Sequence, residues 1–487
     1  MGYGRRIIYS DATEITIENV ADEVRKAVAV HEANRADADK LYGYYCGKTA
    51  ILNKTKEIRP EINHKISENH AHEVTRFYEG YIFGEPIQYV RRENSAGDDA
   101  DDAIAADINA LNGYNADAGK AACDGKLSKW ILISGVGYRM TLPNKEWSAD
   151  GDESPFKKYS LDPRQTFIVR SNDVDCRALM GVYYVKQTDT GERIFSVYTD
   201  RSYFLVKEFG DVEEHPHVLG MIPIIEYPLD ESRLGIFEVA LPLLDALDEL
   251  QSNRMDDIVQ CVNSFLAILG GELDDDTYQK LNEWKTLCLP EGVDAKYLSP
   301  TMSQNDVQTL KNDMYQAVLT ICGVPNRNGG SSTSDTGVAT IVRDGWSAAE
   351  GRAKTIETSF KESEKLSLKL DLRILRDTVG TRLRLSDIDI HFTRRNYENI
   401  ASKAQVLTQM LSNGKIHPEL AFQHCGMFAD PESAYLQSKI WWEEQERKQE
   451  EKIEKELERN ADSGADSVSG VQQETDGLEG SSASQMS

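Results

Sequence analysis

The hydrophobic period of the chain changes from two to 3.6 near residue 230, and this change constrains the fold more than any other feature. Residues 130–227 consist of β-branched and aromatic runs cut by turn residues, which predicts a region of strands. Within it, residues 189–191 predict a hairpin turn between strands 182–187 and 193–199. Long helical patterns follow, so we expect an α+β fold that is mainly helical.

Two apolar stripes at helical spacing follow the strands. The first predicts one long helix over 236–269, which Gly270 and Gly271 end. Its apolar positions are Ile236, Val239, Leu243, Leu247, Leu250, Ile258, Val262 and Leu269. A second helix is predicted over 304–322, with Val307, Leu310, Met314, Ala317, Val318 and Ile321 on one face. The two helices flank the compact segment 272–303, an arrangement that indicates a stalk carrying a tip.

The chain then alternates between loop, helix and strand signals. Residues 323–337 are rich in Gly, Ser and Asn and predict a flexible loop. A helical run is expected over 338–377, with Asp335 as a candidate N-cap and with Gly345 and Gly351 as points where it bends or is cut. Apolar and polar residues alternate over 386–395, which predicts a strand that returns to the sheet of residues 130–227.

Three further segments complete the organisation. Residues 91–125 are rich in Asp, Ala and Gly, which predicts a solvated, mobile loop or a weak helix. The glycines at 134–137 are interpreted as a bend in a strand. Residues 397–460 are expected to be helical, ending in an exposed helix supported by Glu/Lys pairs. The acidic residues 461–487 predict a disordered tail.

Composition bounds the classes of partner. The 487 residues carry a formal net charge of -26, which argues against a protein that grips nucleic acid through a basic face. Seven widely spaced cysteines indicate reduced thiols rather than a disulfide framework or a zinc knuckle. A signal peptide and a run of 18 apolar residues are not found, so we expect a soluble protein made in the cytoplasm, without membrane contact.

The triplet Gly47-Lys48-Thr49 is the end of a phosphate-binding loop but lacks its beginning. A P-loop requires a glycine five residues before Gly47, where this chain has Tyr42, and Gly43 comes one place too late. The preceding residues are polar and helical in character, whereas a P-loop follows a buried strand. We therefore interpret the triplet as a structural turn.

No catalytic or metal-binding constellation is predicted. The aspartates of residues 98–102 lack the glycine and the final glutamate of an EF-hand, and His215 and His217 lack a third ligand at suitable spacing. Asp256 and Asp257 are adjacent and cannot face each other on a helix. We therefore expect a structural protein that is not an enzyme and uses no cofactor.

Three motif regions together resemble the portal proteins of tailed double-stranded-DNA bacteriophages, of the siphophage type. That family has a Tyr-Tyr-x-Gly motif, an Asn-x-Ile-x-x-Asn helix start and a Gly-Tyr-x-Phe-Gly-x-Pro signature, followed by a Gly-x-x-Pro strand and an acidic helix. The matching residues here are Tyr44, Tyr45, Gly47, Asn63, Ile66, Asn69, Gly80, Tyr81, Phe83, Gly84, Pro86, Gly220, Pro223, Ile224, Glu226, Asp245, Ala246 and Ser252. The resemblance spans about residues 40–410, in the same order as in the family.

The resemblance implies a portal fold assembled as a ring, with an α/β wing, a two-helix stem, a small clip, a long kinked helix and a helical crown. The implied regions are an N-terminal helical segment 1–59, wing 60–235 including the acidic loop 91–125, stem helix 236–271, clip 272–303, stem helix 304–325, tunnel loop 326–337, long wing helix and returning strand 338–396, crown 397–460 and tail 461–487.

The implied function is a conduit at one capsid vertex, through which DNA passes inward during packaging and outward at ejection. The implied DNA-channel loop consists of Asn326, Arg327, Asn328, Gly329, Gly330, Ser331, Ser332, Thr333, Ser334 and Asp335. The implied partner-binding clip residues are Tyr278, Trp284, Pro290 and Tyr297. The implied partners are further copies in a ring of about twelve, phage DNA, the terminase large subunit, a head-completion adaptor, and major capsid and scaffold proteins. The implied location is the virion, with assembly in the host cytoplasm.

Two other classes of function stay open at this point. One is an NTP-binding enzyme with a degenerate Gly-Lys-Thr loop, which predicts measurable nucleotide binding. The other is a scaffold or adaptor that is not a portal, built on a coiled coil over 441–460, although that run lacks a sustained heptad seam. Of the three hypotheses, only the portal ring predicts a very large homo-oligomer.

Overall fold

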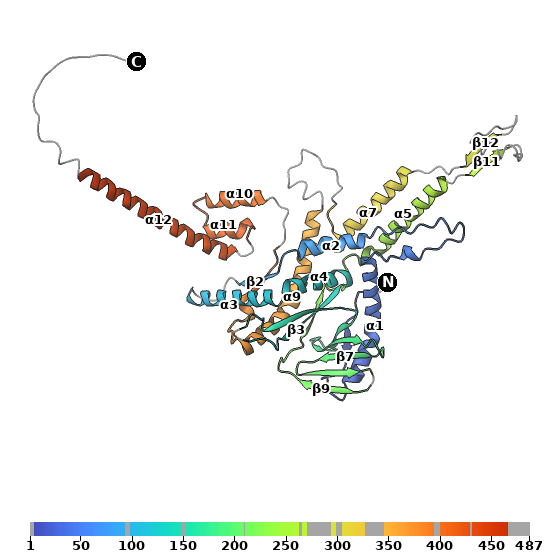
Figure 1. Cartoon of the computed structure of the whole chain (residues 1–487), viewed down its shortest axis with the longest axis horizontal. Coiled ribbons are helices and arrows are strands. Elements are labelled where there is room, and N and C mark those ends of the chain that lie inside the picture. Colours follow the sequence, from blue (N-terminus) through green and yellow to red (C-terminus); the bar gives the residue numbers. More distant parts are fainter. Residues whose placement is uncertain are drawn as a thin grey trace, which may run out of the picture. The chain divides into compact units, whose positions relative to one another are not determined.

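The structure is a computed structural model of the chain and describes residues 4–92, 98–148, 151–208, 210–262, 265–269, 294–298, 304–326, 345–393, 400–428 and 431–465. The chain divides into two compact units, Met1–Arg395 and Asn396–Ser487. The helices described in the first unit are α1 (Val20–Tyr45), α2 (His70–Ile82), α3 (Asp98–Asp117), α4 (Lys120–Ser134), α5 (Leu241–Val262), α7 (Gln304–Cys322) and α9 (Trp346–Thr378) (Figure 1).

A six-stranded sheet forms the outer layer of this unit, in the order β1-β5-β6-β7-β8-β9. Its strands are β1 (Ile8–Ser10), β5 (Thr166–Ser171), β6 (Ala178–Lys186), β7 (Arg193–Tyr198), β8 (Ser202–Lys207) and β9 (Val212–Pro216). β1 pairs in parallel with β5, and the other pairs are antiparallel. The predicted hairpin at 189–191 is confirmed, because β6 and β7 pair on either side of it. The N-terminal half of α1 covers one face through Val20, Val24 and Ala27.

A three-stranded sheet, β10-β3-β4, packs against the other face of the first sheet. Its strands are β3 (Val136–Pro143), β4 (Phe156–Leu161) and β10 (Ile224–Pro228). Alternation along β10 places Ile224 with the first sheet and Ile225 and Tyr227 in the main core, which α2, α4 and α9 share. This sheet is therefore buried on both faces and positions α9.

The strand predicted at 386–395 exists as β13 (Ile388–His391), but its predicted partner is wrong. β13 pairs antiparallel with β2 (Gln88–Arg91) in a separate two-stranded sheet and not with the strands of residues 130–227. The alternation identified the buried face, with Ile388 and Ile390 inside, but it carries no information about the partner strand.

Two predictions before β3 are corrected. The segment 91–125 is helical in its described part, as α3 and the start of α4, so the loop alternative is wrong for it. Residues 130–134, predicted as strand, belong to α4, and Gly135 is the C-cap of that helix at φ 76° rather than a strand bend. The last turn of α4, residues 131–134, is buried on every side, so it shows no amphipathic period that would reveal a helix.

The helix predicted over 304–322 is confirmed as α7, whereas the one predicted over 236–269 is partly wrong. α5 ends at Val262, and β11 (Phe265–Leu269) then pairs antiparallel with β12 (Asp294–Leu298). Figure 1 shows α5 and α7 side by side, leading to this short ribbon. Val262 and Leu269 continued the apolar stripe by coincidence of spacing, because a short apolar run such as residues 265–269 fits either a helix or a strand.

The long helix predicted over 338–377 is confirmed in its described part as α9, which begins after Gly345 and continues through Gly351. Gly345 is the N-cap at φ 85°, so the predicted interruption at that residue is correct. Residues 338–344 and the candidate cap Asp335 lie outside the described residues.

Charged side chains are sealed beneath α9, in a cluster that we call the α9 seat, formed by Lys120, Asp124, Arg139, Lys158, Glu364 and Asp371. Arg139 from β3 donates to Glu364 of α9 at 2.5 Å and also pairs with Asp124 of α4. Lys158 from β4 pairs with Asp371 at 2.6 Å. Three cations balance three anions, so the charges are buried as pairs and fix the position of α9 on its sheet.

The second unit contains helices α10 (Ile400–Leu411), α11 (Pro418–Cys425) and α12 (Pro431–Ala465). Phe422 of α11 stacks on Phe428 and contacts Trp442 of α12, with centroids 5.3 and 6.2 Å apart. The predicted helical character of 397–460 is confirmed for these residues. The helix continues to Ala465, and the rest of the predicted tail lies outside the described residues.

Candidate functional site

Most residues assigned to the two implied sites lie outside the described residues. Of the DNA-channel loop, Asn326 is described, and residues 327–335 are not. Of the clip candidates, Tyr278, Trp284 and Pro290 are not described, and the backbone of Tyr297 lies in β12 opposite Leu266. The site is therefore built from the elements that hold these segments at their ends.

The first end of segment 327–344 is fixed where α7 stops. Gly323 adopts φ 69° after the helix, and the Val324 N–H donates to the Leu319 carbonyl at 2.8 Å. The Tyr78 hydroxyl of α2 donates to the carbonyls of Cys322 and Gly323, each at 2.9 Å. Tyr78 is fully buried, and burial raises its pKa, so it remains a donor throughout the physiological range.

The second end of segment 327–344 lies next to the first end. A Cβ added at Gly345 would lie 3.9 Å from the Cα of Pro325, so the two ends of segment 327–344 are adjacent. Trp346 contacts the rings of Phe77 and Tyr81 of α2 at centroid distances of 6.0 and 5.8 Å. Both ends are thus attached to α2, and we call this arrangement of α2, the end of α7 and the start of α9 the loop platform.

Arg352 connects the loop platform to the chain that leads into α5. Its Nη1 donates to the Ile321 carbonyl at 3.2 Å, and its Nη2 donates to the Ile236 carbonyl at 3.5 Å. One guanidinium from α9 therefore joins the last turn of α7 to the segment before α5.

A segment without helix or strand, residues 54–69, lies along α5 and is called the arm below. Its residues 63–68 are extended. Alternate arm residues donate their backbone N–H groups to side chains one helical turn apart: His64 to Asp256 at 2.8 Å, Ile66 to Ser252 at 2.9 Å and Glu68 to Asp248 at 2.9 Å. Two extended residues advance about 6.6 Å and four helical residues about 6 Å, so the two spacings match. The result is an antiparallel ladder between the arm and α5.

Charge reinforces the ladder at its far end. Asp256 has a buried carboxylate that pairs with Lys54 at 3.3 Å and also with Lys56 and His64. Burial alone raises the pKa of Asp256, but hydrogen bonds from Lys56 and His64 outweigh it and hold the pKa well below its usual range. Asp256 is therefore ionised wherever the chain is folded near neutral pH.

A second polar contact joins α2 to α7. Lys311 pairs with Glu68 at 2.6 Å, and His70 lies between Glu68 and Glu73 at 3.2 and 2.9 Å. Burial opposes ionisation of both groups, yet hydrogen bonding lowers the pKa of Glu68 to about 2 and raises the pKa of His70 to about 9. His70 is therefore a cation at neutral pH.

Several of the residues that carry the family resemblance lie at this seam. Tyr44 donates to Asp245 at 2.8 Å, and the Asn69 side-chain amide donates to the Tyr45 carbonyl at 3.2 Å. Gly47 adopts φ 80°, where a Cβ would lie 3.3 Å from that amide. The turn at 47–49 ends α1, which confirms the structural interpretation of the Gly-Lys-Thr triplet. Sequence reasoning missed Asp248 and Asp256, although their four-residue spacing with Ser252 was a detectable signal.

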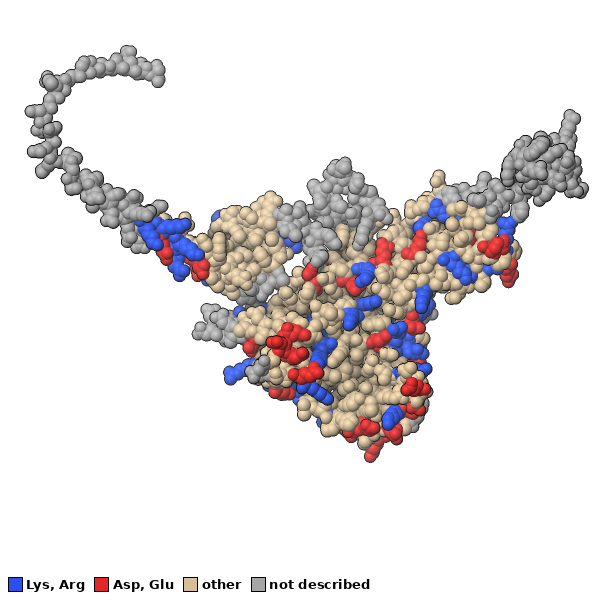
Figure 2. Space-filling model, in the orientation of Figure 1, with Lys and Arg blue, Asp and Glu red and all other residues tan. Residues whose placement is uncertain are grey.

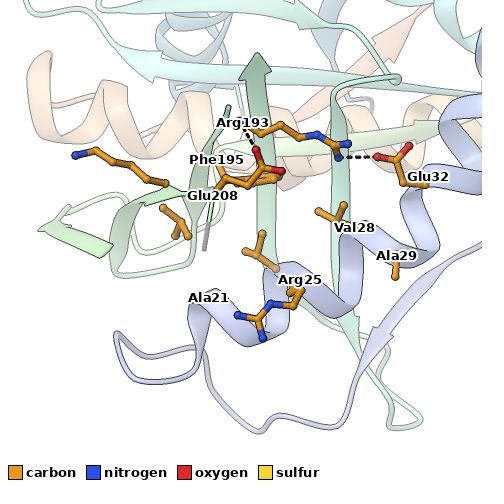
Figure 3. A pocket seen from close by; sticks show the side chains of 11 residues that line it. Ala21, Arg25, Val28, Ala29, Glu32, Arg193, Phe195 and Glu208 are labelled. Carbon is orange, nitrogen blue, oxygen red and sulfur yellow. Dashed lines mark hydrogen bonds and ion pairs between the residues drawn. The ribbon is translucent and has the colours of Figure 1, made fainter. Parts of the chain in front are cut away.

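A hollow of about 270 Å³ lies between α1 and strands β7 and β8 (Figure 3). Val24, Val28 and Phe195 belong to its apolar lining. At its rim, Arg193 pairs with Glu32 at 2.6 Å. The lining contains no Ser, Cys or His side chain.

The described surface gives no sign of a basic grip on nucleic acid. On the face drawn in Figure 2, Lys and Arg are interspersed with Asp and Glu. Within the described ranges, no group of three or more His, Cys, Asp or Glu side chains could hold a metal ion. The described helices also include none with the length and hydropathy to cross a membrane.

Comparisons with known structures find weak likenesses to necks of gene transfer agent (GTA) particles. The neck of an empty particle, computed with C6 symmetry, is 15% identical at a TM-score of 0.45, and the match covers 74% of this chain and 90% of that chain. The neck of a native particle, computed with C12 symmetry, is 14% identical at 0.43, with 74% and 89% covered. No curated protein matches the chain.

The family comparison is decisive. The family described as phage portal protein, SPP1 Gp6-like, matches residues 25–459, which is most of the chain. The match includes the arm, α5, α7 and the loop platform. The chain therefore belongs to the SPP1 Gp6-like family of phage portal proteins.

Proposed function

We propose that twelve copies of the chain form a closed ring at one capsid vertex, through which double-stranded DNA enters during packaging and leaves at ejection. The observation that carries this proposal is the loop platform, because segment 327–344 leaves and rejoins the chain at one rigid point. A segment whose ends meet in this way can change without moving α7 or α9, which hold its two ends. Twelve such segments would line a central channel.

The regions of the portal follow from this assignment. The two larger sheets with α9 form the wing, and α5 with α7 form the stem. β11 and β12 carry the clip at the end of the stem, and the three helices of the second unit form the crown. The role in this scheme is mechanical and electrostatic, with no catalytic step.

The charge of the chain suits a conduit. At -26 per copy, twelve copies carry roughly -300 formal charges, so phosphates find no deep electrostatic well in which DNA would stall. Small polar residues at the constriction, including Ser331 and Ser332, would follow a duplex whose helical symmetry differs from that of the ring. Arg327 would be the cation of this loop.

The proposed partners contact different regions. The clip, including Tyr278, Trp284, Pro290 and Tyr297, would bind the terminase large subunit during packaging and a head-completion adaptor afterwards. Aromatic residues commonly dominate the energy of such interfaces. Major capsid and scaffold proteins would contact the ring during assembly in the host cytoplasm, before it becomes part of the virion.

Imaging of the purified chain by negative stain, together with native mass spectrometry, tests the ring. We expect closed rings of about twelve copies with a central hole. A small defined oligomer that binds ATP would overturn the proposal in favour of an enzyme.

Deletion of residues 328–334 tests the role of the loop. Because both ends meet at the loop platform, the shortened chain should still form rings, but packaged DNA should be lost or reduced. The matched control is a deletion of equal length in the tail, 470–476, which should package normally. Unchanged packaging and retention in the loop deletion would contradict the channel assignment.

A further inference from the structure

The turn between α10 and α11 contains an Asn-Gly pair in a defined geometry. The Ile416 N–H donates to the Asn413 carbonyl at 2.9 Å, and the Lys415 N–H donates to the Asn413 side-chain oxygen Oδ1 at 3.2 Å. Asn413 is therefore the first residue of a β-turn and also forms an Asx turn. Residues 412–415 are exposed, so the turn is open to water.

The backbone nitrogen of Gly414 is left free by this turn. Among the described residues, none accepts a hydrogen bond from the Gly414 N–H. Because glycine has no side chain, its nitrogen can approach the side chain of the preceding residue more closely than that of any other residue. A Cβ added at Gly414 would meet no atom within 4 Å, so the turn is not packed against other elements at this point.

The Lys415 N–H adds a third component. When a nitrogen attacks Cγ of Asn413, negative charge develops on Oδ1. A backbone N–H that already donates to this oxygen stabilises that charge, as the donors of an oxyanion hole do. Three consecutive residues thus supply an attacking nitrogen, the carbon that it attacks and a donor for the developing charge.

We propose that Asn413 is a site of spontaneous modification, at which the Gly414 nitrogen displaces the side-chain amide. The bond between the Gly414 nitrogen and Cγ forms, the bond between Cγ and Nδ2 breaks, and the Gly414 N–H proton leaves with Nδ2 as ammonia. Water then opens the cyclic imide at either of its two carbonyls, which gives aspartate or isoaspartate. Water is the only reactant that the chain does not supply, and the reaction does not depend on the proposed ring.

A second Asn-Gly pair, Asn112-Gly113, shows what suppresses the reaction. It lies inside α3, where the Gly113 N–H is a donor of the helix. The backbone of Tyr89 holds both polar atoms of the Asn112 side chain: Nδ2 donates to the carbonyl at 2.8 Å, and Oδ1 accepts from the N–H at 3.2 Å. The same two residue types are therefore fixed in α3 and free in the turn. A third pair, residues 328–329, lies outside the described residues.

The modification changes the charge at the end of a helix. Each event replaces a neutral amide by a carboxylate just after α10 ends at Leu411. The last carbonyls of a helix carry partial negative charge, so a carboxylate beside them is unfavourable. The last turn of α10 should therefore be less stable in modified copies.

Peptide mapping of the full chain during incubation at mildly alkaline pH measures the reaction. Trypsin places the three Asn-Gly pairs in different peptides, and mass spectrometry follows the modified fraction of each. Asn112 reacts only when α3 opens locally, so Asn413 should be modified at least about tenfold faster. Both aspartate and isoaspartate should appear at Asn413. Equal rates at the two residues, or aspartate alone at Asn413, would overturn the proposal.

The same measurement in urea separates the effect of the turn from that of the flanking sequence. Both pairs then lie in an unfolded chain, so their rates should become similar. If Asn413 kept its full advantage over Asn112 in urea, the flanking residues and not the turn would be the cause, and the proposal would be wrong.

Gly414→Ala tests the attacking nitrogen. The added methyl group hinders the approach to Cγ, so the reaction at Asn413 should slow about tenfold or more. The open space around Gly414 lets this variant keep the fold of the turn. Gly113→Ala is the matched control and should leave the rate at Asn413 unchanged. Modification of Gly414→Ala at the wild-type rate would contradict the role of this nitrogen.

Discussion

Charged side chains hold both α9 and α5 in place. Those of the α9 seat are sealed from water, whereas those along the arm are partly exposed to it. Arg139 and Glu364 have side chains that are 0% exposed, while His64 on the arm is 38% exposed. Sealed charges tolerate little change of position, because water cannot replace the partners that stabilise them. A hydrated seam can exchange partners with solvent. The comparison teaches that α9 is held in a fixed frame, whereas the seam between the arm and α5 is adjustable.

Removal of one sealed charge should have the largest effect. Arg139→Met leaves Lys120 as the one remaining cation paired with the two buried carboxylates of Asp124 and Glu364, so the free energy of unfolding should fall by about 3–5 kcal/mol. Urea denaturation of the full chain measures it. Lys157→Met, which removes an exposed pair with Glu146, is the matched control and should change stability by less than about 1 kcal/mol. Equal effects would remove the distinction between sealed and hydrated charges.

The alkaline pH dependence of stability should report on His70. Its folded-state pKa of about 9 lies above its ordinary value, so the stabilisation is fully present below about pH 6.5 and is lost as pH rises through 9. The group is partly exposed, and the expected loss is on the order of 2 kcal/mol. His70→Gln should flatten this part of the profile.

His31 provides the control for that profile. Burial lowers its pKa to about 4, so its contribution is lost as pH falls below 6.5 and not as pH rises. His31→Gln should therefore leave the alkaline slope unchanged. An alkaline slope that persists in His70→Gln would show that another group controls it.

The smallest effect is expected within the ladder. Ser252→Ala removes the acceptor of the Ile66 N–H, and stability should fall by about 1 kcal/mol. Hydrogen exchange should become faster at arm amides, especially Ile66, and stay unchanged beneath α9. Thr358→Ala, which removes an exposed hydroxyl within α9, is the control. Uniform acceleration in both regions would mean that the arm and the wing open as one unit.

The sequence predicted the elements whose hydrophobic period is visible. The prediction failed where that period is hidden by burial on every side or is shared by a helix and the strand that follows it. α7 was predicted at its observed bounds because its apolar positions repeat along an otherwise polar helix. α4 was interpreted as strand because its end is apolar on every side, and the end of α5 was extended because β11 continues its stripe.

The candidate site was predictable only through local motifs. Tyr44, Gly47 and Asn69 were identified by resemblance, and the structure shows why they occur together at one turn. Contacts between distant positions carry no local signal. Arg139 and Glu364 are 225 residues apart, and only the seating of α9 on its sheet brings them together.

The closeness of Gly345 to Pro325 has a consequence for how portals diversify. An insert whose two ends lie side by side can be replaced by one of another length, because its length does not set the distance between the elements that hold its ends. Doubling the length of such an insert changes the closure free energy by only about 0.6 kcal/mol. In the proposed ring, aperture and shell could therefore evolve independently, and a pore engineer could resize the proposed opening while leaving its frame untouched.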